Sequence, residues 1–510
     1  RNSPEKKIPV SLAKNANLFG GSFRTPVVFS TRKPDLCDMQ ISPTLQSFGA
    51  AATVTGSKHL ITTVTGEKIL LDCGLFQGEG KDSDEKNRNW GFNPSEIDFV
   101  ILSHAHIDHT GLIPKLVRDG FRGPIYCNAA TFDLCEIMLM DGAHIQESDL
   151  RFINEKRKRK GLEPLDPLYT KDDVADTLRY FEIRDNSTSF QVGQSTHVQF
   201  IPNAHILGSV AIHLSLVNIE GERVTLNYTG DIGRENDRIL DGPHPFPKSD
   251  YILCESTYGD RLHSQEGNDL VTLERLARRI CVEQKGSIVI PAFSVDRTQE
   301  IIYLLDELAF EGKLPQIPVY VDSPLSVKAT NIMSKHRDNF NPDILAYIEK
   351  DGNPFDFPHL HYTSTVEDSK AINADPVPCI IISASGMAEA GRVKHHIAHR
   401  ISDPKNAILL VGYATPYSLA GQLIQGKEEV RIFGDTYQVK AEIHRMSGFS
   451  AHADYQEMLH YLKSSAKPEE TKKIFLVHGQ WEAMSHFKGV LNGNGFKDVV
   501  PCEWGKTYEL

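Results

Sequence analysis

The feature that most constrains this sequence is a short run that concentrates three imidazoles and one carboxylate, Ser103-His104-Ala105-His106-Ile107-Asp108-His109. It follows the apolar run Phe99–Leu102, which predicts a buried strand, and it precedes a predicted helix that begins at Leu112. No helix could aim four side chains with this spacing at one centre, so the run must be a loop. Imidazole and carboxylate groups are ligands suited to zinc. The run therefore predicts a metal-binding loop at the end of a strand.

Other parts of the chain carry single His, Asp or Glu residues, most of them at or shortly after the end of a strand-like run. Each of these residues alone is more often a cap or a loop residue than a ligand. Together they are harder to explain in that way, because strands can deliver residues from distant parts of the chain to one rim. The residues are Asp72, His205, Asp231, Glu255, His452 and His478.

The ordered set formed by Asp72, the histidine-rich loop, His205 and Asp231 resembles the metallo-β-lactamase superfamily. Glu255, His452 and His478 are similar to motifs A, B and C of its β-CASP branch, which includes RNase J and the endonuclease subunit of the cleavage and polyadenylation machinery. Three further stretches, residues 291–300, 319–325 and 383–387, are similar to landmarks of this branch, although Asp296 replaces the usual glycine. The resemblance covers about residues 45–510.

The resemblance implies a fold of the α/β class, an αββα metallo-β-lactamase sandwich with an inserted α/β β-CASP domain. The order of predicted elements agrees, since short β runs dominate up to about residue 258 and strands then alternate with helices, as in a parallel sheet. We therefore expect a leader or small appended element at 1–44, a metallo-β-lactamase domain in two parts at 45–258 and 437–510, and the β-CASP domain at 259–436.

The resemblance also implies two Zn²⁺ per chain. The first implied site is formed by His104, His106, His205 and Asp231, and the second by Asp108, His109 and His478, with Asp231 bridging both. Asp72 resembles the carboxylate that orients the loop and its ligands. His452 is the candidate general acid, which Glu255 would keep protonated. The implied catalytic set is Asp72, Asp108, Glu255 and His452.

Zinc chemistry suits phosphodiester hydrolysis, because water bound to zinc has a pKa near about 7 rather than about 15.7. The histidine at the third motif, His478, resembles the RNA-acting members of the branch, and this favours RNA over DNA. We expect a ribonuclease that acts on single-stranded RNA, internally or from the 5′ end. A DNA nuclease, a small-molecule ester or lactam hydrolase, and an RNA-binding scaffold remain alternatives.

Four residues are candidate contacts to the substrate. Ser385 lies in one of the β-CASP-like stretches, and Arg392 follows it shortly as a candidate phosphate contact. Lys156 and Arg157 begin the basic run 156–160, which is expected to follow the helix predicted at Thr131–His144. This run could track phosphates near the entrance, or it could be a solvated loop.

Composition excludes several other classes of protein. The chain has 510 residues with 55 Lys and Arg against 67 Asp and Glu, a formal net charge of −12, which argues against a generally cationic nucleic-acid binder. Its eight cysteines are widely spaced without a C-x-x-C pair, which argues against a disulfide scaffold. No apolar run approaches the roughly 18–20 residues of a membrane span, and no signal peptide is visible. We expect a cytoplasmic protein that does not contact membranes, and a homodimer is compatible with the sequence.

Overall fold

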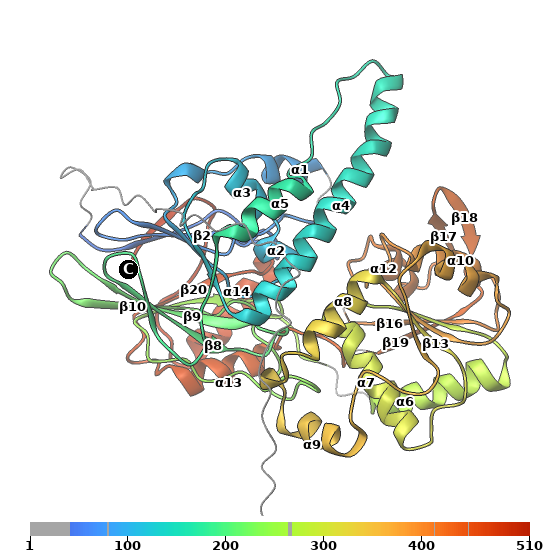
Figure 1. Ribbon diagram of the computed structural model, residues 1–510. Helices are drawn as coiled ribbons and strands as arrows, with labels where there is room; N and C mark the ends of the chain where they lie inside the picture. Colours follow the sequence, from blue (N-terminus) through green and yellow to red (C-terminus); the bar gives the residue numbers. More distant parts are fainter. Residues whose placement is uncertain (1–40, 79–80, 264–267, 413, 447) are drawn as a thin grey trace, which may run out of the picture. The chain divides into compact units, whose positions relative to one another are not determined.

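Figure 1 shows the computed structural model, which describes residues 41–78, 81–263, 268–412, 414–446 and 448–510. All of these residues belong to one compact unit, residues 34–510. Most of the leader expected at 1–44 therefore lies outside the described residues.

A seven-stranded sheet forms the first layer of a sandwich. In spatial order its strands are β22 (Thr507–Glu509), β1 (Thr44–Ser47), β2 (His59–Thr62), β3 (Lys68–Leu71), β4 (Phe99–Ile101), β5 (Ile125–Cys127) and β6 (Phe181–Ile183). The strands β1 to β3 form the antiparallel meander that the short β runs predict, and β3 to β6 pair in parallel. The late strand β22 pairs with β1, so widely separated parts of the chain close this sheet.

A second seven-stranded sheet packs against the first. Its strands, in spatial order, are β21 (Val499–Pro501), β20 (Lys473–Val477), β11 (Tyr251–Glu255), β10 (Arg223–Tyr228), β9 (Val210–Val217), β8 (Thr196–Pro202) and β7 (Phe190–Val192). Ile69 and Leu71 of β3 are buried in one cluster with Leu214 of β9, so the sheets share a core between them. The strand β20 pairs in parallel with β11, although about two hundred residues separate them in the chain.

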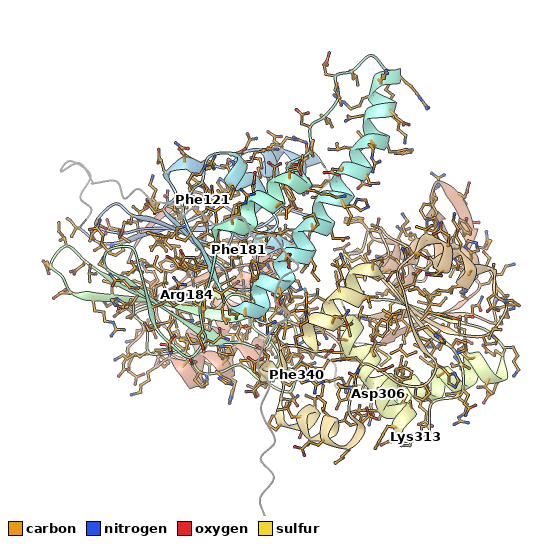
Figure 2. The ribbon with its side chains drawn as sticks, viewed as in Figure 1. Phe121, Phe181, Arg184, Asp306, Lys313 and Phe340 are labelled. Carbon is orange, nitrogen blue, oxygen red and sulfur yellow. The ribbon has the colours of Figure 1, made fainter. Side chains whose placement is uncertain are left out.

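Helices cover the outer face of each sheet and complete the αββα sandwich (Figure 1). Phe121 is buried in the core on the outer side of the first sheet, beneath α3 (Ile113–Arg118) and α5 (Lys171–Thr177) (Figure 2). The helices α13 (Tyr455–Ser465) and α14 (Trp481–Gly493) pack against the second sheet, with Met458 and Met484 buried in the shared core. The remaining helical elements on the side of the first sheet are α1 (Lys81–Arg88), α2 (Ile107–Thr110), α4 (Ala129–Arg159) and two 3₁₀ turns, Pro94–Glu96 and Leu178–Tyr180.

A six-stranded parallel sheet lies in the segment between β11 and β20. Its spatial order is β14 (Leu360–Thr363), β13 (Val319–Asp322), β15 (Ile380–Ser383), β12 (Ile288–Pro291), β16 (Ala407–Val411) and β19 (Glu442–Met446). One face is covered by α6 (Asp269–Leu276) with its π-helical continuation Ala277–Glu283, α7 (Arg297–Phe310), α8 (Pro324–Met333) and α9 (Pro342–Asp351). The other face is covered by α10 (Val366–Ala374), α11 (Val393–Arg400) and α12 (Leu419–Ile424). Covering both faces with helices is typical of parallel sheets, and the alternation of strands and helices predicted this arrangement.

This sheet extends past the domain boundary expected at residue 436. The strand β19 lies inside the segment 437–510, yet it pairs in parallel with β16 from Glu442 to Met446. It follows a small hairpin of β17 (Glu429–Ile432) and β18 (Asp435–Gln438). Only Met446 of β19 is fully buried. Polar and apolar residues alternate irregularly in this edge strand, so its sequence does not indicate whether it belongs to the six-stranded sheet or to the sandwich.

Asp296 stands at the turn before α7, where the resembled branch usually has a glycine. Its φ of 73° lies in the left-handed region, which glycine adopts without strain. The buried Asp296 carboxylate pairs with the Arg297 guanidinium, which also pairs with Glu300. The turn therefore places a non-glycine residue at positive φ, and its carboxylate belongs to a buried ion-pair group.

The helix α4 is longer than the sequence predicts. The predicted helix Thr131–His144 is too short at its carboxyl end, because α4 continues to Arg159 and includes Lys156 and Arg157 in its last turn. The prediction that the basic run follows the helix is therefore wrong. Beyond Ala143 no residue of α4 is fully buried, so the apolar periodicity ends although Glu, Lys and Arg continue to favour a helix.

Composition also leads to expectations about membrane spans and about the cysteines. None of the helices in the described ranges is long and apolar enough to cross a membrane. The seven cysteines in these ranges are buried and free, as the wide spacing of cysteines predicts.

Candidate metal centre

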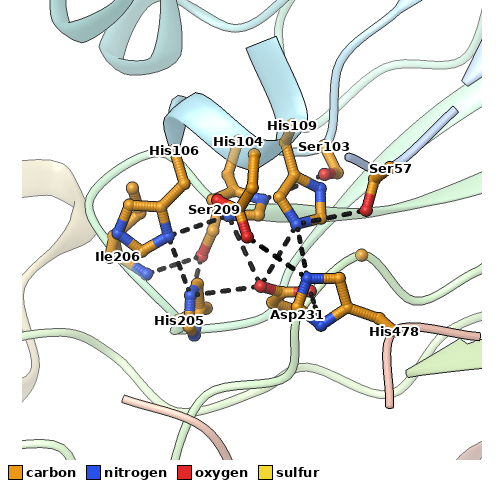
Figure 3. Close-up of polar contacts among 12 residues, drawn as sticks. Ser57, Ser103, His104, His106, His109, His205, Ile206, Ser209, Asp231 and His478 are labelled. Atoms are coloured by element: carbon orange, nitrogen blue, oxygen red, sulfur yellow. Dashed lines mark hydrogen bonds and ion pairs between the residues drawn. The ribbon is translucent and has the colours of Figure 1, made fainter. Parts of the chain in front are cut away.

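The loop after β4 contributes His104 and His106 to a first group of side chains (Figure 3). The Nδ1 atom of His106 lies 3.1 Å from the Nε2 atoms of both His104 and His205. Asp231 Oδ2 lies 3.7 Å from His104 Nε2 and 3.5 Å from His205 Nε2. His205 follows β8 and Asp231 follows β10. The group therefore joins a loop of the first sheet to two strand ends of the second.

A second group is formed by Asp108, His109 and His478. His478 directly follows β20, and its Nε2 lies 3.3 Å from His109 Nε2 and 3.4 Å from Asp108 Oδ2. Asp231 Oδ2 lies 3.3 Å from His109 Nε2. One carboxylate oxygen of Asp231 thus faces both groups, and these two groups contain the other six side chains of the expected ligand set.

The spacing of these atoms fits metal binding. Ligand atoms at about 2.0–2.1 Å from a tetrahedral zinc ion stand about 3.3–3.4 Å from one another. The separations from Asp231 Oδ2, between 3.3 and 3.7 Å, are close to that value. The other oxygen, Asp231 Oδ1, is buried and accepts no hydrogen bond in the described part of the chain, and His478 Nδ1 lies 3.6 Å from it. A buried carboxylate oxygen is costly to leave unpaired, and a cation would compensate for it.

The electrostatics of the first group favour ligand states of its side chains. Burial, followed by the nearby histidines, lowers the pKa of His104 and His205 well below 6.5. Burial likewise lowers the pKa of His106 to about 4. Burial alone would raise the pKa of Asp231, but His109 and His478 hold it well below 3.8. Neutral imidazoles and an ionised carboxylate are the forms that bind a metal. In the second group, burial alone would lower the pKa of His109, but Asp231 and Asp72 raise it well above 6.5.

Asp72 holds the loop in place from the end of β3, where its φ is 59°. Its Oδ2 accepts hydrogen bonds from Ser103 Oγ at 2.7 Å, His109 Nδ1 at 2.8 Å and Tyr228 OH at 2.7 Å. Its Oδ1 accepts from the Ser103 backbone N–H at 2.8 Å. Because Nδ1 of His109 is held by Asp72, its Nε2 is turned towards the centre. The sequence indicated Asp72 but not Tyr228, which looks like an ordinary core residue of β10.

Thr257 orients His478 and was also missed. Its Oγ1 lies 2.9 Å from His478 Nδ1 and 2.9 Å from the His478 carbonyl oxygen. A carbonyl only accepts, so the hydroxyl donates to it and accepts from Nδ1–H. The Nε2 lone pair of His478 is then free to face the centre. Only the position of Thr257, two residues after Glu255, could have drawn attention to it.

Glu255 and His452 form a pair beside the two groups. The fully buried Glu255 ends β11, and its Oε2 lies 3.2 Å from His452 Nδ1. The His452 ring centre lies 4.6 Å from that of His205 and 5.9 Å from that of His478. Burial alone would lower the pKa of His452, but Glu255, Asp231 and Asp108 raise it to about 9. His452 is therefore able to hold a proton at neutral pH.

Ser385 and Arg392 lie on one loop that follows β15 in the six-stranded sheet. Arg392 donates to Asp322 Oδ1 at 2.6 Å and to the Ser364 carbonyl oxygen at 2.8 Å. The buried Oγ of Ser385 has no hydrogen-bond partner among the described atoms. Polar side chains therefore gather where strands of this parallel sheet end, which is the edge where such sheets bind ligands. Within the described ranges, neither side chain forms a hydrogen bond or ion pair with the metal groups.

The basic run is not brought to the metal groups. Near its start, α4 is tied to the segment after His205, because Thr131 Oγ1 donates to the Gly208 carbonyl oxygen at 2.8 Å. At about 1.5 Å per residue, Lys156 lies about 38 Å further along the helix. Lys156 Nζ lies 4.1 Å from the centre of the exposed Phe152 ring. Lys156 and Arg157 therefore lie far from the metal groups, at the other end of α4.

Comparison with protein-family models assigns three regions of the chain. Residues 58–292 match the metallo-beta-lactamase superfamily, and residues 298–423 match the Beta-Casp domain. Residues 436–501 match the Zn-dependent metallo-hydrolase RNA specificity domain. These matches confirm the resemblance inferred from the motifs and support a metal cofactor.

Curated relatives cover most of the chain. Ribonuclease TTHA0252 of Thermus thermophilus is 34% identical over 437 residues, which is 86% of this chain and 93% of the relative. The RNase J-like protein of Methanocaldococcus jannaschii is 30% identical over 81% of this chain and 87% of its own length. Transcription termination factor FttA of Methanosarcina mazei is 29% identical over 86% of this chain and 67% of its own length. The chain belongs to the metallo-beta-lactamase superfamily, in the branch that carries a Beta-Casp domain.

Proposed function

We propose that this chain is a zinc-dependent ribonuclease that hydrolyses phosphodiester bonds of single-stranded RNA. The observation that carries the proposal is the position of Asp231 Oδ2, 3.3 to 3.7 Å from imidazole nitrogens of both ligand groups. The relatives named as a ribonuclease and as RNase J-like, together with the RNA specificity domain, support RNA as the substrate.

We assign two zinc ions to each chain. His104, His106 and His205 would hold one ion, and Asp108, His109 and His478 the other, with Asp231 shared between them. When bound, zinc lowers the pKa of water to about 7 and neutralises phosphate oxygens, so that hydroxide is available at neutral pH.

The remaining residues orient groups and move a proton. Asp72 fixes His109 and the loop that carries Asp108. His452 donates a proton to the oxygen that leaves from phosphorus, and Glu255 holds the charged imidazole in position. With Asp72 and Asp108, these two residues complete the proposed catalytic set.

The substrate strand is proposed to contact both domains. Arg392 has five N–H donors, of which two are used in the described contacts, so others are left for a phosphate. Ser385 Oγ offers a hydroxyl beside it, and Lys156 and Arg157 would contact a more distant part of the strand. A cytoplasmic location and a homodimer are compatible with this proposal.

The test compares His104→Ala with a matched surface variant, His460→Ala, whose side chain is largely exposed on α13. We expect about two zinc ions per wild-type chain and fewer in His104→Ala. Cleavage of single-stranded RNA should fall by at least about 10³-fold in His104→Ala and stay unchanged in His460→Ala. End-labelled RNA would distinguish internal cleavage from cleavage at an end.

Two results would contradict the proposal. Undiminished cleavage by His104→Ala after loss of zinc would remove the metal groups from the chemistry. Equal or faster cleavage of a DNA oligonucleotide of the same sequence would replace RNA by DNA as the substrate.

A further inference from the structure

The end of β11 and the segment that follows it contact the proposed proton donor, His452, at three points. Glu255 pairs with the imidazole at its Nδ1 atom. The Tyr258 ring centre lies 5.9 Å from that of His452. His263 Nε2 lies 2.9 Å from the His452 backbone carbonyl oxygen. The first two contacts act on the imidazole itself, whereas the third acts on the main chain that carries it.

The direction of the third contact follows from its chemistry. A backbone carbonyl only accepts hydrogen bonds, so Nε2 of His263 carries the hydrogen and donates it. The side chain of His263 is only 9% exposed. Burial, followed by the charge of Arg234, lowers its pKa below 6.5, which favours the neutral ring. Its nearer acceptor is the His452 carbonyl oxygen at 2.9 Å, and Glu457 Oε2 lies 3.5 Å from the same nitrogen.

The backbone of His263 joins the segment after β11 to the start of α13, directly after the loop that carries His452. The His263 backbone N–H donates to Asp454 Oδ2 at 3.0 Å. Asp454 caps the helix, because its Oδ1 accepts from the backbone N–H of Glu457 at 3.0 Å. Glu457 Oε2 in turn accepts from the Asp454 backbone N–H at 2.9 Å, which completes a capping box.

This cluster also reaches the segment that follows Asp231. Arg234 Nε donates to Glu457 Oε1 at 3.3 Å, and the Ala453 backbone N–H donates to the Ile232 carbonyl oxygen at 2.8 Å. His263, Asp454 and Glu457 are close enough for a cation to be considered. However, their carboxylate oxygens already accept N–H groups of the protein, and this assigns them to holding the loop.

We propose that His263 is a positioning residue that fixes the main chain of the His452 loop, so that the His452 imidazole meets the leaving oxygen of the scissile phosphate. The inference rests on the proposed function. In hydrolysis, a bond forms between phosphorus and the oxygen of water while the bond to the leaving oxygen breaks. His452 gives its proton to that oxygen and regains one from solvent. A displacement of about 1 Å of such a donor can cost about 10²-fold in rate.

The test uses two substrates that differ in their need for a proton. The alkoxide that leaves from RNA requires one, whereas bis(p-nitrophenyl) phosphate releases a stable phenolate that does not. The variants are His263→Met, which keeps the size of the side chain but removes the donor, and His263→Gln, whose Nε2 can still donate to the His452 carbonyl. Zinc content and thermal stability of both variants are measured first, against wild type.

We expect His263→Met to lower kcat on RNA by about 10- to 100-fold with KM unchanged, and to keep kcat on bis(p-nitrophenyl) phosphate within about twofold. His263→Gln should recover most of the loss on RNA. His452→Ala should show the same contrast between substrates with a larger loss, and adding His263→Met to it should cost nothing more.

The outcomes separate this inference from the proposed function. If His452→Ala discriminates between the substrates but His263→Met lowers both equally, or His263→Gln is no better than Met, His263 is merely structural. If His452→Ala itself does not discriminate, the role proposed for His452 fails, and the positioning role fails with it. If zinc-depleted protein cleaves RNA normally, the proposed function fails before His263 is considered.

Discussion

At the scale of single residues, Asp72 shows how one carboxylate can fix the orientation of a residue of the candidate metal centre. Four donors converge on its carboxylate, two from Ser103 and one each from His109 and Tyr228. The carboxylate cannot rotate without breaking several of these hydrogen bonds. The orientation of His109 therefore depends on residues that lie behind it, including Tyr228 on the opposite sheet.

Replacing Tyr228 by Phe tests this dependence. The substitution removes only the hydroxyl that donates to Asp72 Oδ2, so the core should stay packed while the carboxylate becomes less constrained. We expect zinc affinity to fall by about tenfold, measured by competition with a chelator. Tyr461→Phe is the matched control, because the buried Tyr461 hydroxyl has no partner among the described residues. Equal zinc affinities in the two variants would contradict the role of Tyr228.

Sequence patterns found the charged and imidazole side chains of the centre but not their supports. The loop 103–109 was recognisable because its residue types are rare at that spacing, and His478 because it ends an apolar strand. Tyr228, Thr257 and His263 carry no such signal, since hydroxyl groups and lone histidines occur throughout folded proteins. Their roles depend on a pairing between strands distant in the chain, such as β11 with β20, which periodicity does not contain.

At the scale of elements, α4 connects the centre to a basic end. Its first turn is tied to the segment after His205, and its last turn carries Lys156 and Arg157. The helix is buried only along its first half. The returning chain is held to the second half by Asn154, whose side chain bonds both the N–H and the carbonyl of Leu165. The basic end is therefore held on an ordered element rather than on a loop.

The double substitution of Lys156→Gln with Arg157→Gln tests whether this end contacts RNA. Each lost phosphate contact removes about 0.7 from the slope of log K against log salt for a single strand. We expect weaker binding of long single-stranded RNA at low salt and a shallower slope, with kcat unchanged because the metal groups are remote. The control is Lys463→Gln with Lys497→Gln, two exposed lysines elsewhere. Identical slopes in wild type and the α4 variant would exclude a contact.

At the scale of the whole molecule, the inserted domain separates the two parts of the sandwich in the sequence, but the site residues of both parts still lie together. β11 precedes the six-stranded sheet and β20 follows it, yet they are neighbours and carry Glu255 and the residue before His478. The change in element order near residue 258 predicted an inserted α/β domain. Its far limit was harder to predict, because the edge strand β19 is short and mixed in polarity.

The proposed metal centre links the two sheets of the sandwich, so removal of metal should weaken the fold. The residues 104–109 follow β4 of the first sheet, whereas His205, Asp231 and His478 follow strands of the second. A ligand that binds only the folded state stabilises it by about 4 kcal/mol when its free concentration is about 1,000 times Kd. We expect a strong chelator to lower the Tm by at least about 5 °C and zinc to restore it. In His104→Ala, which lacks one ligand, the chelator should shift the Tm less. An unchanged Tm after measured loss of zinc would mean that the ligand loops are held by protein contacts alone, with Asp72 rather than the cations joining the layers.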